Sequence, residues 1–154
     1  MSDSSSPKLI VPAMAGLYDA LSGWGVPLIR FFTGLMLMPH GSQKLFEWFG
    51  GNREGAAGFF ESIGLAPGSF WVIVVGIIEF FGGACLALGF LTRIAAAGIV
   101  ILMAVAVFAV HMGNGFFWTK GGYEYPLLWG LVALGFFLHG GGRASIDRAI
   151  GREF

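Results

Sequence analysis

The amino-acid sequence predicts an all-α integral membrane protein built as a four-helix bundle. Of its 154 residues, 56% are hydrophobic and only 12% are charged, whereas soluble domains carry about 25% charged residues. The stretch from Phe70 to Phe90 contains a single charged side chain. As a helix rising about 1.5 Å per residue, this stretch crosses the roughly 30 Å of a bilayer's hydrocarbon core. We therefore expect the lipid bilayer to surround most of the chain.

Four apolar stretches define a membrane domain over residues 25–142. The expected spans lie at about residues 26–46, 70–90, 94–111 and 124–139. The first is the least regular, because Pro39 lacks the amide hydrogen of a continuous helix and predicts a kink or an early end. The connection at residues 91–93 is so short that the second and third spans are expected to form an antiparallel hairpin.

The segments outside these spans are shorter and more polar. Residues 1–24 are expected to form an N-terminal tail with an interfacial helix, since apolar residues recur at helical spacing between Leu9 and Leu21. Residues 54–63 predict a short interfacial helix between the first two spans. Residues 143–154 predict a charged C-terminal tail.

The distribution of basic residues predicts the orientation of the bundle. Four spans place both termini on the same side of the membrane, and six of the nine Lys and Arg residues fall on that side. Because cytoplasmic segments carry an excess of Lys and Arg, both termini and the C-terminal tail are expected in the cytoplasm.

Charge and cysteine content exclude several classes of function. The formal net charge is zero, whereas a nucleic-acid-binding domain carries a basic stripe. The single cysteine, Cys85, forms neither an internal disulfide nor a C-x-x-C redox pair. The sequence also lacks a flavin or dinucleotide fingerprint. Electrons for any redox reaction must therefore come from a partner.

Glu79 is the residue around which the chain is organised. It lies near the middle of the second span, where an ionisable group costs a few kcal/mol unless it faces protein or water. Glycines at positions 76, 82 and 83 allow a neighbouring helix to approach on the same side. An intramembrane acid predicts a functional site, and the alternative is a structural hydrogen bond between the first two spans.

The predicted topology brings further polar groups to the outer half of the bundle. These are His40 and Lys44 at the end of the first span, His111 at the end of the third, and Tyr123 and Glu124 at the start of the fourth. With Glu79 they predict a polar pocket near the outer face. The alternatives are that Lys44 extends to the lipid headgroups, and that His111 and Glu124 only complement helix dipoles. Arg30 is expected at the inner side.

Short motifs recur in a fixed order over residues 25–150. They are R-x-x-x-G from Arg30, H-G-x-x-K from His40, G-x-x-E-x-x-G-G from Gly76, L-G-x-x-T-R from Leu88 and G-x-x-S-x-D from Gly142. His111 precedes a glycine-rich loop and Glu124 opens the last span. This order resembles the DoxX family of small four-helix bacterial membrane proteins. The resemblance implies a multi-pass protein of the bacterial inner membrane, related to a subunit of thiosulfate:quinone oxidoreductase.

The resemblance and the polar pocket together favour a quinone-linked redox protein, or a subunit of a membrane oxidoreductase with a soluble or membrane redox partner. The expected catalytic residues, which donate hydrogen bonds and relay protons, are Glu79, His40 and His111. The expected quinone-binding residues are Arg30, Lys44, Tyr123 and Glu124. Two alternatives stay open. One is a non-catalytic membrane scaffold or small-solute carrier, and the other is a metal or haem site built from the histidines and glutamates.

Overall fold

A computed structural model describes residues 9–153 of the protein, and within that range all regular structure is helical. The prediction of an all-α chain is thereby confirmed. The long helices are α2 (Gly25–Leu45), the run of α4 (Gly68–Ile77), η3 (Ile78–Gly82) and α5 (Gly83–Leu88), the run of α6 (Thr92–Val105) and η4 (Ala106–His111), and α7 (Glu124–His139).

Two of these helical runs are long and apolar enough to cross a membrane. They cover Gly68–Leu88, with 21 residues, and Thr92–Asn114, with 23 residues. A third candidate exists if the helices Pro12–Leu21 and Gly25–Leu45, which meet at a bend of 50°, form one broken span. The helix α7 is apolar but has only 16 residues. The described chain thus contains two to three candidate spans.

The first predicted span does not end at its proline. Helix α2 continues through Pro39 to Leu45, so the early end that the sequence suggested is wrong. Helix α2 packs closely against the second span on the N-terminal side of this proline. A side chain at Gly34 would collide with the backbone of Gly83 and Ala87, so the two helices meet backbone to backbone.

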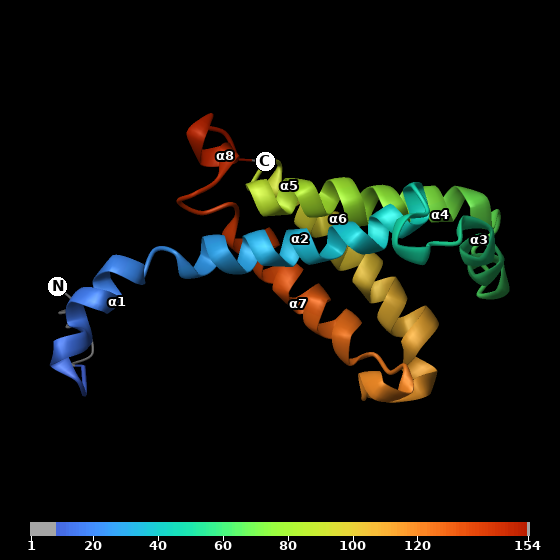
Figure 1. The fold of residues 1–154 in the computed structure, drawn as a ribbon, viewed down its shortest axis with the longest axis horizontal. Coiled ribbons are helices and arrows are strands. Elements are labelled where there is room, and N and C mark those ends of the chain that lie inside the picture. The colour runs from blue at the N-terminus through green and yellow to red at the C-terminus, as the bar shows by residue number, and fades with distance from the viewer. Residues whose placement is uncertain (1–8, 154) are drawn as a thin grey trace.

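The helices form two antiparallel pairs that are joined at one end. Helix α2 packs along α4–α5, and α6 packs along α7 (Figure 1). The buried core between the pairs contains Leu37, Leu86, Ala96, Ile99, Met103, Ala133 and Phe136. Toward the end that carries α3 (Arg53–Ser62), the α6–α7 pair diverges from the other pair (Figure 1). This divergence creates the space in which the candidate site lies.

The expected helix between the first two spans is present as α3 (Arg53–Ser62). The Asn52 side chain accepts a hydrogen bond from the Gly55 amide at 2.8 Å and so caps its N-terminus. Arg53 donates to the carbonyl of Lys44 at 3.0 Å and thereby fixes α3 against the end of α2.

The terminal segments contain short helices. Helix α1 (Ala15–Leu21) occupies part of the predicted N-terminal interfacial segment, and α8 (Ile146–Ala149) lies in the predicted C-terminal tail. The predictions for residues 1–8 and residue 154 lie outside the described residues.

The backbone contact at Gly34 predicts a sharp sensitivity to side-chain size. Gly34→Ala should lower the free energy of unfolding by about 1–3 kcal/mol, because the added methyl group forces α2 away from α5. Thermal unfolding in detergent measures the effect. The matched control is Gly135→Ala on α7, where an added Cβ has no neighbour within 4 Å and stability should hold or rise slightly. Equal effects of the two substitutions would contradict the close packing.

Candidate functional site

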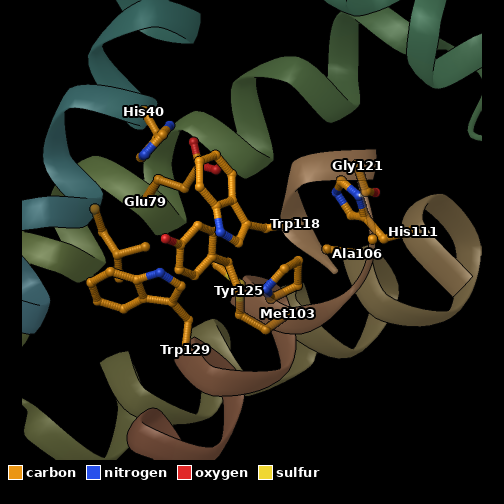
Figure 2. A pocket seen from close by; sticks show the side chains of 12 residues that line it. His40, Glu79, Met103, Ala106, His111, Trp118, Gly121, Tyr125 and Trp129 are labelled. Atoms are coloured by element: carbon orange, nitrogen blue, oxygen red, sulfur yellow. Dashed lines mark hydrogen bonds between the residues drawn. The ribbon is translucent and has the colours of Figure 1, made fainter. Parts of the chain in front are cut away.

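A cavity of about 350 Å³ lies where the two helix pairs diverge. Its walls come from α2, η3, the α6–η4 run, the loop after it, and α7 (Figure 2). The polar and aromatic groups in the lining are His40, Glu79, His111, Trp118, Tyr125 and Trp129. The structure therefore brings together all three residues that the sequence indicated as catalytic, and it adds three aromatic side chains.

Glu79 is buried, with 8% of its surface exposed, and it faces protein. Its Oε2 atom accepts a hydrogen bond from Lys44 Nζ at 2.7 Å, which makes a salt bridge between α2 and η3. Lys44 also donates to the carbonyl oxygen of His40 at 3.3 Å. The Lys44 ammonium group thus extends inward to the acid rather than outward to lipid headgroups, and this pairing offsets part of the cost of burying the carboxylate.

Two π-helical turns position the titratable groups of the cavity. Glu79 lies in η3 and His111 ends η4. A π-helical turn inserts extra backbone into an otherwise α-helical run and rotates the residues that follow it, and such turns occur frequently at functional sites. The sequence pattern did not indicate either turn.

The two histidines lie on opposite sides of the cavity (Figure 2). His111 Nδ1 lies 2.6 Å from the carbonyl oxygen of Gly121, and since a carbonyl only accepts, Nδ1 is the donor. Its Nε2 is then left for a ligand. Among residues 9–153, no group of three or more His, Cys, Asp or Glu side chains is arranged to hold a metal ion. The metal-site alternative therefore gains no support from the geometry.

Tyr123 and Glu124 lie beside the cavity and do not line it. Glu124 accepts a hydrogen bond from the Trp118 amide at 3.1 Å. The Tyr123 ring packs edge-on against Phe116, with ring centroids 5.6 Å apart. Both contacts fix the loop that presents Trp118 to the cavity. A direct role for either residue in ligand binding stays a prediction.

Arg30 lies near the opposite end of α2, away from the cavity. Only 3% of its surface is exposed, and it donates hydrogen bonds to the carbonyls of Gly141 and Ala144, the latter at 2.6 Å. A longer bond of 3.4 Å reaches the carbonyl of Ala87. Arg30 thus ties the C-terminal segment to the helices, and its ligand-binding role also stays a prediction.

Asp147 is a buried structural residue to which sequence reasoning gave no role. Its carboxylate accepts hydrogen bonds from the amides of Leu91 and Thr92 at 2.8 and 2.9 Å, and from the Thr92 hydroxyl at 2.6 Å. Burial alone raises the pKa of Asp147, but these hydrogen bonds and the nearby charge of Arg30 outweigh it and lower the pKa below its ordinary value. The only sequence signal was its place in the G-x-x-S-x-D motif.

Comparisons with known proteins identify one matching family and several relatives. The DoxX family profile matches residues 25–112, which is more than half of the chain. A Haemophilus influenzae protein described as uncharacterized is 34% identical over 122 residues, covering 77% of this chain and 85% of the relative. An uncharacterized membrane protein of Mycobacterium tuberculosis is 29% identical over 154 residues, covering 92% and 91% of the two chains.

One relative has a functional name. A Bacillus subtilis protein named "Putative oxidoreductase CatD" is 32% identical over 123 residues, covering 80% of this chain and 84% of the relative. No solved structure gives a significant match. The apolar helices and these relatives define the chain as a helical membrane protein. It belongs to the DoxX family.

The Asp147 contacts predict that the C-terminal segment depends on pH and on one carboxylate. Because the folded-state pKa is lowered, the stability from Asp147 is fully present above its ordinary pKa of about 4 and is lost as pH falls through the folded value. Asp147→Asn should lower the free energy of unfolding by about 1.5–3 kcal/mol at pH 7, the scale of hydrogen bonds to a charged group. Thermal unfolding should show this difference shrinking below pH 4. A difference that is constant down to pH 3 would contradict the assignment.

Proposed function

We propose that this protein is a quinone-linked redox protein, or a subunit of a membrane oxidoreductase complex, in the bacterial inner membrane. The observation that carries the proposal is the cavity itself. It places the titratable side chains of His40, Glu79 and His111 between aromatic walls, at the diverging end of apolar helices. A membrane-soluble ligand with a polar ring would find there both polar partners for the ring and apolar contacts for the rest of the molecule.

The size and chemistry of the cavity fit a quinone headgroup. Its volume of about 350 Å³ lies within the ~300–1,000 Å³ typical of small-molecule sites. Apolar contacts come from Leu37 and Met103, while His40 and Tyr125 supply polar groups. Predominantly apolar walls with a few polar groups are the usual composition of such a site.

The chain's own residues would bind the quinone ring and transfer its protons. A quinone takes up two electrons and two protons at its carbonyl oxygens. His40 donates a hydrogen bond to a quinone carbonyl, His111 accepts one at Nε2 from a hydroquinone hydroxyl, and the Glu79 carboxylate takes up and returns protons. Lys44, which is paired with Glu79, connects that acid to the end of α2. The electrons come from a soluble or membrane redox partner, because the sequence lacks a flavin or iron–sulfur motif. The relative named as an oxidoreductase supports the redox assignment.

The proposal includes a four-span topology. We place α2, the Gly68–Leu88 run, the Thr92–Asn114 run and α7 in the bilayer, with both termini in the cytoplasm. Antiparallel packing of α6 on α7 and the six-to-three distribution of basic residues support this arrangement. The cavity then opens near the outer face.

Glu79→Gln is the direct test of the proposed site. The purified protein should bind a short-chain benzoquinone and its hydroquinone, as measured by quenching of tryptophan fluorescence. Glu79→Gln should weaken hydroquinone binding by about tenfold or more, because a hydroxyl group then loses a charged acceptor. The matched control is Glu54→Gln on the exposed face of α3, which should bind as the wild type does. Absence of binding in the wild type, or unchanged affinity in Glu79→Gln, would refute the assignment.

A further inference from the structure

Three aromatic side chains line the same cavity as Glu79. Trp118 comes from the loop after η4, and Tyr125 and Trp129 come from α7 (Figure 2). The Trp118 and Tyr125 rings are 5.4 Å apart between centroids, with an interplanar angle of 34°. In this view the Trp118 ring overlaps the Glu79 carboxylate, and Tyr125 and Trp129 lie below it (Figure 2). A quinone site does not by itself require three aromatic rings and a carboxylate in the same cavity.

The Glu79 carboxylate is only partly satisfied by its salt bridge. Lys44 binds the Oε2 atom, and among the described residues no group donates a hydrogen bond to Oε1. Glu79 lines the cavity, whereas Lys44 does not. A negatively charged oxygen is therefore presented to the cavity from a wall that carries no Lys or Arg. The other titratable groups of the lining are His40, His111 and Tyr125.

We propose that this cavity binds an organic cation of the quaternary ammonium class, seated between the aromatic rings and the Glu79 carboxylate. Aromatic faces attract cations electrostatically, and the attraction is strongest where water is excluded. A quaternary ammonium group has no N–H to satisfy, so the apolar side chains of Leu37 and Met103 suit the rest of its surface. This binding activity goes beyond the proposed redox function.

Lys44 should weaken such binding without blocking it. Its ammonium group approaches Glu79 from outside the cavity, so a cation inside does not need to displace it. Its positive charge nevertheless opposes a second cation at the same carboxylate.

The experiment compares benzyltrimethylammonium with neopentylbenzene, in which carbon replaces the charged nitrogen. Tryptophan fluorescence of the full chain in detergent reports both affinities. The wild type should prefer the cation by at least about tenfold, the scale of a desolvated cation–π contact. Glu79→Gln should reduce this preference by about tenfold, and Trp118→Leu by about two- to fivefold, the scale of a cation–π contact at a half-exposed ring. The control Trp48→Leu removes an exposed tryptophan outside the cavity and should leave the preference unchanged.

Equal affinities for the two probes in the wild type would overturn the inference. So would a cation preference that persists in both Glu79→Gln and Trp118→Leu. Trp118 is 54% exposed, so its replacement leaves the buried core intact even if a substitution at Glu79 impairs folding. Cation preference without quinone binding would refute the redox proposal alone, and quinone binding without cation preference would refute only this inference.

Discussion

The ion pair between Lys44 and Glu79 is the interaction on which the cavity depends. An acid within an apolar span is tolerated only when it faces protein and finds a partner. The partner can reach it because α2 lies close to the α4–η3 run at two glycines. A side chain added at Gly41 would collide with Phe80, and one added at Gly76 would meet the Leu45 side chain and the base of Lys44. The glycine contacts between the helices are therefore what allows the Lys44–Glu79 salt bridge to form. Together they fix a carboxylate on the wall of a cavity that is otherwise mostly apolar.

The opposite end of the bundle is held by a separate buried polar network. Arg30 binds carbonyls of the C-terminal segment, and Asp147 caps the start of α6. With that end fixed, the α6–α7 pair diverges from the other pair only toward α3 (Figure 1). The cavity, its aromatic lining and the two π-helical turns all occur at this diverging end. Hydrogen bonds of Arg30 and Asp147 thus hold the helices together at one end of the molecule, and the candidate site lies at the other.

The sequence predicted the helices and the inward orientation of Glu79, because both follow from local patterns. Apolar runs and their turns set the helical segments, and a carboxylate in such a run demands a partner on a neighbouring helix. The lack of a break at Pro39 could not be read locally, because a proline within an apolar run is compatible with a kink, an early end or a continuous helix. The lining by Trp118 and Trp129 was also missed, since an aromatic residue near a span end equally fits a membrane interface. The placement of Arg30 depends on a C-terminal fold that no periodicity reveals.

The most direct test of this account is a double-mutant cycle between Lys44 and Glu79, read as free energies of unfolding in detergent. Lys44→Met and Glu79→Gln should each destabilise the protein, and the double variant should be less destabilised than the sum of the two. The expected coupling is about 1–3 kcal/mol, the range for residues in direct contact. Additive effects would mean that the two side chains do not interact, and the cavity would then lack the feature that organises it.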